Sequence, residues 1–140
     1  FKRAEENIKI MFGHMNYAPI VPISAKEDTG IKQLLNTVME LYNQLNRKID
    51  TASLNTALRD WVAAYPPPAS RSASFKMRYI TQTSVNPVEF LIFATRPEVV
   101  QQTYLSYIKN KVRTDLGFDK IPVKVELKAS RTKWENRSRT

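Results

Sequence analysis

Apolar side chains recur at intervals of three and four residues in four segments of this chain, which is the spacing of one face of an α-helix. The clearest example is the run of Ile31, Leu34, Leu35, Val38, Leu41, Tyr42 and Leu45. The pattern predicts helices over residues 4–14, 31–45, 54–65 and 97–116. The side chains expected to cap the last three helices are Asp28 or Thr29, Thr51 or Ser53, and Thr95.

Four other segments have the patterns of β-strands. Residues 17–23 are a nearly continuous apolar run interrupted by two prolines, which favours a buried parallel strand. Residues 74–83 and 88–95 alternate in polarity and are joined by the turn-like residues 84–87, so we expect an antiparallel pair. A closing strand is predicted by the alternating residues Val123, Val125 and Leu127.

The order of these elements divides the chain into four parts. Residues 1–46 have the order helix, strand, helix, which is the final piece of an α/β sheet whose other strands are absent. Residues 47–52 are a polar linker, and residues 53–128 have the order helix, strand, strand, helix, strand of a two-layer α+β domain. Residues 129–140 form a basic tail. One strand and two helices cannot close a core, so we expect the apolar faces of the first part to need a missing sheet.

The composition is that of a folded domain, with 42% apolar residues and only 3 glycines among 140 residues. The chain has no cysteine, which excludes disulfides, zinc-thiolate sites and thiol catalysis. His14 is its single histidine, so no imidazole pair is available for metal binding or Ser-His chemistry. No apolar run approaches the ~18 residues of a membrane-spanning helix. We therefore expect a soluble cytoplasmic protein with no membrane partner and no bound metal.

Positive charge is concentrated in the second part of the chain. Residues 1–50 hold 7 Lys and Arg against 6 Asp and Glu, whereas residues 51–140 hold 15 against 7, so eight of the nine net charges lie there. This asymmetry indicates a polyanion partner such as RNA. The candidate RNA-binding residues are Arg71, Lys76, Arg78, Lys109, Lys111, Arg113, Lys124, Lys128, Arg131, Lys133, Arg137 and Arg139.

A short motif follows the first predicted strand. Residues 17–23 run into Ser24-Ala25-Lys26, and Thr29-Gly30-Ile31 then begins a helix. The later sequence has Pro66-Pro67-Pro68 and a helix with two tyrosines, in the order of the predicted elements. Over residues 1–128 this succession resembles the C-terminal end of the Der (EngA) family, bacterial ribosome-assembly GTPases with two tandem G domains and a KH-like domain.

The resemblance implies a fold, ligands and partners. It implies a KH-like domain preceded by the final helix, strand and helix of a P-loop G domain. A backbone N–H at Ser24 and Ala25 would meet the guanine carbonyl, and the stem of Lys26 would cover one face of the ring. The parent protein would bind GTP with Mg²⁺. Its partners would be the large ribosomal subunit, ribosomal RNA and its own upstream G domains.

The motifs that handle phosphate are missing from this chain. It has no Gly-rich phosphate loop, no Asp-x-x-Gly and no Asn-Lys-x-Asp, so it offers no catalytic residue and no magnesium ligand. We therefore expect it to be inactive and free of cofactor when alone. Because it opens at Phe1 within a charged segment, we interpret it as the C-terminal part of a longer GTPase.

The expected mode of RNA binding is electrostatic. KH domains clamp nucleotides with a Gly-x-x-Gly loop, which this sequence lacks, so contacts to phosphates remain. The aromatic residues predicted to pack in the core rather than to stack on bases are Trp61, Phe75, Phe90, Phe93, Tyr104 and Tyr107. Tyr79 fits either face of its strand, and Trp134 in the basic tail is the better stacking candidate.

Two other functional classes remain open from the residues. The chain could be a non-enzymatic RNA-binding adaptor in which Ser24-Ala25-Lys26 is an incidental turn. It could also be a protein-interaction domain whose basic surface meets acidic partners. The reading frame upstream of Phe1 separates these classes from a GTPase, since a GTPase of this type would show two phosphate loops there.

Overall fold

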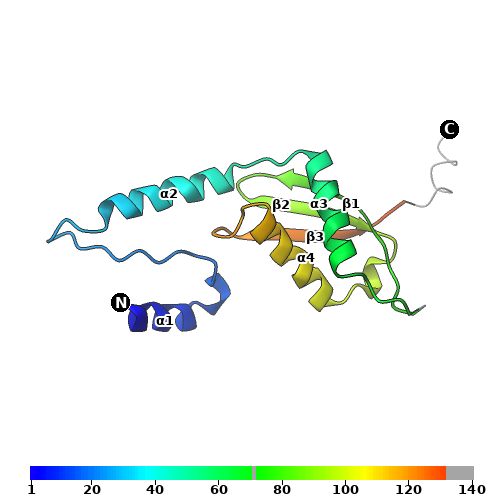
Figure 1. Ribbon diagram of the computed structural model, residues 1–140, viewed down its shortest axis with the longest axis horizontal. Coiled ribbons are helices and arrows are strands. Elements are labelled where there is room, and N and C mark those ends of the chain that lie inside the picture. The colour runs from blue at the N-terminus through cyan, green and yellow to red at the C-terminus, as the bar shows by residue number, and fades with distance from the viewer. Residues whose placement is uncertain (71, 132–140) are drawn as a thin grey trace.

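The computed structural model describes residues 1–70 and 72–131, which form an α+β structure with one three-stranded sheet. Its helices are α1 (Lys2–Met11), α2 (Ile31–Leu45), α3 (Thr51–Ala64) and α4 (Gln102–Asp115). Its strands are β1 (Met77–Ser84), β2 (Val88–Ala94) and β3 (Val123–Ala129). In Figure 1, α3 and α4 lie along one face of the sheet, while α1 and α2 extend away from it. The predicted order helix, strand, strand, helix, strand is confirmed.

The sheet has the order β1-β2-β3, so β2 is its central strand. β1 and β2 are antiparallel, with Ile80 opposite Ile92. β2 and β3 are parallel, with Phe90 opposite Val125. Parallel neighbours need a crossover connection, and α4 supplies it.

The hydrophobic core lies between the sheet and helices α3 and α4. Every second residue of β2 is buried, from Val88 to Ala94, which is the alternation expected of a strand with one face on a core. Buried side chains around this strand include Leu54, Leu58, Trp61, Phe75, Ile80, Tyr104, Ile108, Val112, Phe118, Ile121 and Val123. The predicted packing of Trp61, Phe75, Phe90 and Tyr104 in the core is thereby confirmed.

The cap of α3 differs from the prediction. Asp50, and not Thr51 or Ser53, is the capping residue, and its carboxylate accepts hydrogen bonds from the Ser53 N–H at 2.9 Å and the Ser53 hydroxyl at 2.7 Å. These hydrogen bonds to the charged form lower the pKa of Asp50. The acidic side chain also suits the positive end of the helix dipole.

The start of α4 also differs from the prediction. Thr95 does not cap it, because Pro97–Val99 forms an isolated 3₁₀ turn and Val100 is extended, with a ψ of 115°. The helix then begins after Gln101, which makes no side-chain capping bond. Val99 and Val100 pack against the core, so their burial holds this segment out of the helix.

The predicted strand over residues 17–23 does not form. The only β-pairing of the described residues before Met77 is an isolated bridge between Ser24 and Thr29. Two prolines remove backbone donors from this segment, and no strand of the described residues pairs with it. The large exposed apolar side chains of this part of the chain are Phe1, Ile8, Ile10, Met11, Phe12, Met15, Ile23, Leu35, Val38, Met39 and Tyr42. Much of the apolar surface of residues 1–46 is thus exposed in the described structure.

The connection between α2 and α3 is attached to the sheet through the buried amide of Gln82. The Gln82 Nε2 donates to the Arg47 carbonyl at 2.8 Å, and its Oε1 accepts from the Ile49 N–H at 2.8 Å. The Lys48 ammonium donates to the Gln82 carbonyl at 2.9 Å. These bonds hold the polar connection on the surface of the sheet domain.

The end of α2 is held by a second buried amide. Gln44 donates to the Asp119 carboxylate at 2.9 Å and accepts from the Lys120 N–H at 3.0 Å. The Asn86 N–H in the β1–β2 turn donates to the Leu45 carbonyl at 2.9 Å. The last turn of α2 therefore contacts two loops at the same end of the sheet.

The burial of β2 predicts a large cost for truncating it. Ile92 is fully buried, so Ile92→Ala should lower the free energy of unfolding by about 2–5 kcal/mol. The matched control is Ile10→Ala, because Ile10 is 80% exposed on α1 and its truncation should change the free energy by less than about 0.5 kcal/mol. Urea unfolding of both variants measures this, and equal losses would contradict the structure.

The Gln82 contacts predict a second effect. Gln82→Ala leaves the Ile49 N–H and the Arg47 carbonyl without their partner, which should cost about 1–3 kcal/mol. Hydrogen exchange at Ile49 should also become faster. Gln33→Ala, at an exposed position of α2, is the control and should change neither quantity. Unchanged exchange at Ile49 in Gln82→Ala would show that the amide does not hold the connection.

Candidate functional site

The Ser24-Ala25-Lys26 motif forms a closed turn at the beginning of α2. The Ser24 N–H donates to the Thr29 carbonyl at 3.0 Å, and the Thr29 N–H donates back at 3.1 Å. The Ser24 hydroxyl accepts the N–H of Glu27 at 3.2 Å. Ala25 and Lys26 are exposed, and no acceptor among the described residues is bonded to their N–H groups. The turn therefore presents free backbone donors and a free lysine side chain.

Gly30 makes this turn possible. It has a φ of 81°, in the left-handed region that favours glycine, and it caps α2 without a side-chain bond. A Cβ at this position would collide with the Pro22 carbonyl oxygen. The expected caps Asp28 and Thr29 are therefore wrong, because the close approach of residue 22 to the helix start requires glycine.

The turn lies far from the basic residues. In Figure 1 it is at the tip of the molecule beyond α2, opposite the end where the sheet is. The candidate RNA-binding residues within the described chain all lie on the sheet domain or directly after it. The structure therefore separates the predicted guanine turn from the predicted RNA surface, and α2 joins them.

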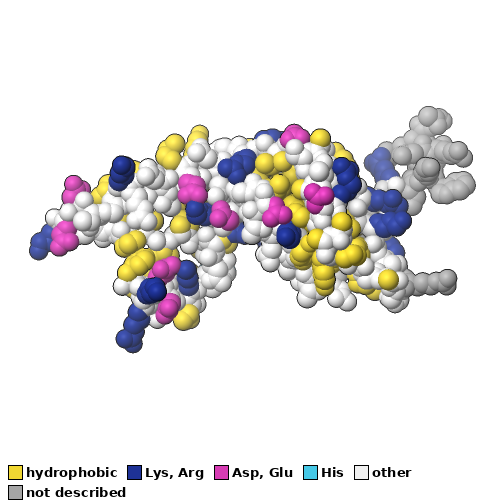
Figure 2. All heavy atoms as spheres, viewed as in Figure 1, with side chains coloured by type: hydrophobic (Ala, Val, Ile, Leu, Met, Phe, Trp, Pro, Cys, Tyr) yellow, Lys and Arg dark blue, Asp and Glu magenta, His cyan; other side chains and the backbone are white. Residues whose placement is uncertain are grey.

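Several candidate cations gather at one end of the sheet. Met77 pairs with Ala94, and Ala94 pairs with Ala129, so the start of β1 lies level with the end of β3. Figure 2 shows Lys and Arg side chains concentrated at this end of the molecule. The cations placed there by the strand register are Lys76, Arg78, Lys128 and Arg131. Arg71, Lys133, Arg137 and Arg139 lie outside the described residues.

The candidate RNA-binding residues on α4 differ in how far their cationic side chains are engaged within the fold. Lys109 is exposed, and the Lys111 ammonium lies 6.0 Å from the centre of the Tyr107 ring. Arg113 is held within the fold, because its guanidinium donates to the carbonyls of Ile121 at 2.8 Å and Asp119 at 2.9 Å. Burial lowers its pKa. Lys109 is thus more available to a ligand than Arg113.

Lys124 is engaged with a neighbouring carboxylate on β3. Its ammonium lies 2.8 Å from Glu126, and this hydrogen bond raises the pKa of Lys124 and lowers that of Glu126. Both side chains are more than half exposed, so the pair contributes little to stability. Lys128 forms no ion pair with any described residue, so its charge is available to a polyanion.

Phe93 and Tyr79 lie on the open face of the sheet. The prediction that Phe93 packs in the core is wrong, because buried positions of β2 alternate and Phe93 falls between Ile92 and Ala94. Its ring centre is 6.3 Å from that of Tyr79, which is 42% exposed. Lys128 pairs with Phe93 across the β2–β3 ladder. Trp134 lies outside the described residues.

The tyrosines of α4 are held by packing. Tyr104 is buried, and its hydroxyl donates to the Tyr65 carbonyl at 2.9 Å. Burial, with smaller contributions from Tyr107 and Tyr65, raises the pKa of Tyr104 to about 12. The half-buried Tyr107 donates to the Trp61 carbonyl at 2.8 Å. Both side chains fit the predicted structural role.

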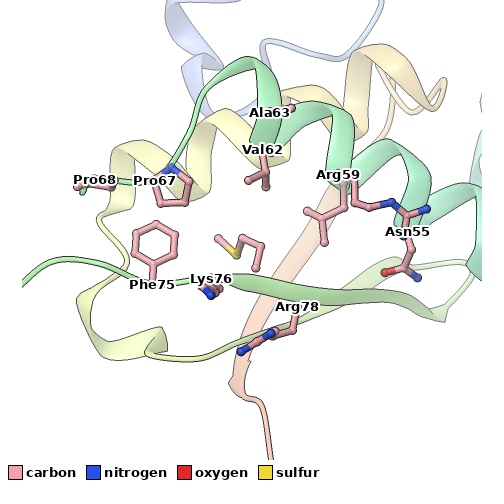
Figure 3. Close-up of a pocket in the computed structure, with 11 residues that line it drawn as sticks. Asn55, Arg59, Val62, Ala63, Pro67, Pro68, Phe75, Lys76 and Arg78 are labelled. Carbon is pink, nitrogen blue, oxygen red and sulfur yellow. The ribbon is translucent and has the colours of Figure 1, made fainter. Parts of the chain in front are cut away.

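Sequence reasoning missed Arg59, which lies across a surface hollow from two predicted cations. This α3–β1 hollow is bounded by the outer side of α3 from Asn55 to Ala63 and by the chain from Phe75 to Arg78. Figure 3 shows Arg59 on the helix side and Lys76 and Arg78 on the strand side. A lone arginine in an amphipathic helix gives no sequence signal, because only the fold brings it beside β1.

Residues 1–70 and 72–131 contain neither a group of metal-ligating side chains nor a membrane-spanning helix. Within these ranges no three His, Asp or Glu side chains lie close enough together to hold a metal ion. None of the helices in this part of the chain is both long and apolar enough to cross a bilayer.

Comparison with known proteins identifies relatives over most of the chain. Residues 48–128 match the family described as KH-domain-like of EngA bacterial GTPase enzymes, C-terminal. GTPase Der of Treponema pallidum is 43% identical over 126 residues, which cover 90% of this chain and 27% of that protein. GTPase Der of Persephonella marina is 36% identical over 126 residues, which cover 90% and 28%. GTPase Der of Caldanaerobacter subterraneus is 32% identical over 128 residues, which cover 91% and 29%. The chain spans little more than a quarter of the length of these curated relatives.

Proposed function

The chain belongs to the family of KH-like domains at the C-terminus of EngA, or Der, bacterial GTPases, and from this membership we propose that it acts within a GTP-binding protein that assembles the large ribosomal subunit. The carrying observation is that its likeness to GTPase Der proteins extends over 126 residues, more than the KH-like match at 48–128. Both parts of the chain are therefore included in the proposal. Its proposed partners are ribosomal RNA, the large subunit and the G domains of the same protein, in the cytoplasm.

The proposed role of the first part is to bind the guanine base. The Ser24 N–H is engaged by the Thr29 carbonyl, so of the expected pair the free N–H of Ala25 is the donor available to a base carbonyl, and the exposed stem of Lys26 can cover a ring face. GTP with Mg²⁺, when bound, supplies the phosphate that is cleaved. We assign the phosphates and Mg²⁺ to G-domain segments outside this chain, because its sequence has no Gly-rich phosphate loop, no Asp-x-x-Gly and no Asn-Lys-x-Asp.

The proposed role of the second part is to bind RNA through phosphates. Lys76, Arg78, Lys128 and Arg131 meet at one end of the sheet, and a group of cations of this kind releases counterions from a polyanion. The sequence has no Gly-x-x-Gly loop, so the usual KH clamp is not available. The proposal is therefore binding that depends strongly on salt and weakly on sequence.

The guanine assignment predicts a site-specific loss of nucleotide binding. In the full-length parent, Ala25→Trp should abolish GTP binding at one of two sites, because the indole would occupy the space of the base. Titration with a fluorescent GTP analogue should show the stoichiometry fall from two to one. Ala4→Trp, at an exposed position of α1, should leave two sites. The 140-residue chain alone should bind no GTP and hydrolyse none. Two intact sites in Ala25→Trp would refute the assignment.

The RNA assignment predicts a change in salt dependence. Replacing Lys128, Arg131, Lys133, Arg137 and Arg139 by Gln should weaken binding to ribosomal RNA and flatten the slope of log affinity against log salt. Each lost phosphate contact accounts for about 0.7 of that slope for single strands. The control replaces the same number of cations in the first part, which are Lys2, Arg3, Lys9, Lys26 and Lys32, and should change the slope little.

Measuring the affinity for ribosomal RNA and for a scrambled RNA across a salt series distinguishes binding through phosphates from base recognition. Similar affinities that fall together with salt support binding through phosphates. Strong discrimination that survives high salt would contradict it and indicate base recognition. If neither RNA binds at low salt, the RNA assignment fails and a protein partner becomes the better hypothesis.

A further inference from the structure

The α3–β1 hollow has the size and lining of a ligand site. Its volume is about 540 Å³. It lies at the β1 edge of the sheet, where α3 packs, whereas α4 packs toward β3 at the other edge. It is therefore separate from the Ser24 turn and from the cations of α4.

The floor of the hollow is apolar. Leu58 and Phe75 are nearly fully buried beneath it, and Val62, Met77 and Pro67 are half-buried along it. Figure 3 shows the rings of Phe75 and Pro67 facing one another at one end. Together these rings and aliphatic side chains offer an apolar surface on which a planar group can pack.

The rim of the hollow is cationic. Arg59 projects from α3 and Lys76 lies on the strand side, while Arg78, which also lines the hollow, extends from β1 away from α3 (Figure 3). None of the three forms an ion pair with a carboxylate of the described residues; the Arg59 guanidinium donates only to the Thr56 hydroxyl, at 3.3 Å. Three unneutralised cations around an apolar floor fit a ligand that has a flat apolar body and negative charge outside it.

A peptide strand is poorly suited to this edge. An extended peptide binds by pairing with the exposed backbone of an edge strand. Here the Asn55 side chain already occupies that backbone, because its Nδ2 donates to the Ile80 carbonyl at 3.0 Å and its Oδ1 accepts from the Ile80 N–H at 3.0 Å. The Lys48 ammonium occupies the next outward carbonyl, that of Gln82. The β1 edge is therefore closed to strand addition at Ile80 and Gln82, directly after the residues that line the hollow.

We propose that the α3–β1 hollow holds one unpaired nucleotide of single-stranded RNA, with the base on the apolar floor and the flanking phosphates on Arg59, Lys76 and Arg78. This inference rests on the proposed RNA-binding function and adds a base-holding site to it. Stacking of a base on a protein surface tolerates any sequence, so the site agrees with weak sequence preference. It distinguishes single strands from duplexes, in which the bases are not free to enter.

Filling the hollow tests the proposal. Ala63 lines it and is exposed on α3, so Ala63→Trp can occupy the space of a base without changing charge. Ala52→Trp, at an exposed position of the same helix outside the hollow, is the matched control. The probes are a fluorescent 12-nucleotide oligouridylate and a 12-base-pair RNA duplex, measured by anisotropy with the full 140-residue chain.

Ala63→Trp should weaken binding of the single strand about tenfold, the loss of one stacked base, while duplex binding changes less than about twofold. Ala52→Trp should change neither. Arg59→Gln should weaken single-strand binding and flatten its salt slope by about 0.7, whereas the exposed Arg3→Gln should not. Circular dichroism and urea unfolding establish that each variant is folded.

The outcomes separate this inference from the function on which it rests. If the chain binds both probes and Ala63→Trp leaves the single strand unaffected, the hollow does not hold a base, although RNA binding stands. Equal losses for single strand and duplex would likewise overturn the site. If the chain binds neither probe at low salt, both proposals fail. If an acidic peptide binds the chain instead and Ala63→Trp abolishes that binding, the hollow belongs to a protein partner.

Discussion

The buried amide of Gln82 is the contact on which the arrangement of the two parts depends. A buried amide must satisfy both its donors and its acceptor, and Gln82 does so with Arg47, Ile49 and the carbonyl of Ser84 at 3.3 Å. Because Arg47 and Ile49 flank a connection only a few residues long, moving it would expose several polar groups at once. The capping residue Asp50 follows directly, so the same contact fixes where α3 begins over β1.

The two faces of the sheet differ in their surroundings: one is covered by helices and the other is open to solvent. One face meets α3 and α4 and holds the core, while the other carries Tyr79, Phe93 and Lys128 toward solvent. A group of cations lies at one end of this sheet, and the Ser24 turn lies beyond α2. A charge cluster placed at a sheet end can meet phosphates without disturbing the packing of the opposite face.

Most of the fold could be predicted because its signals are local. The alternation along β2 and the helical spacing of α3 each follow from which side chains are buried. The predictions that were wrong or incomplete depend on contacts between distant parts of the chain, which the sequence does not show. Residues 17–23 form no strand because no neighbouring strand pairs with them. Which face Phe93 occupies depends on the alternation of buried positions along β2, and Arg59 lies beside β1 only in the folded chain. The Ser24 turn was located by its motif, but its closure by Gly30 depends on the approach of the Pro22 carbonyl.

The attachment of α2 has a mechanical consequence for the proposed function. A helix of 15 residues is about 22 Å long and stiff, and Gln44 and the connection hold its last turn to the sheet domain. Its first turn begins at Gly30, directly after the proposed guanine turn. Because its last turn is held to the sheet domain, a displacement of α2 at the Ser24 turn would be transmitted to that domain, since bending the helix would break backbone hydrogen bonds.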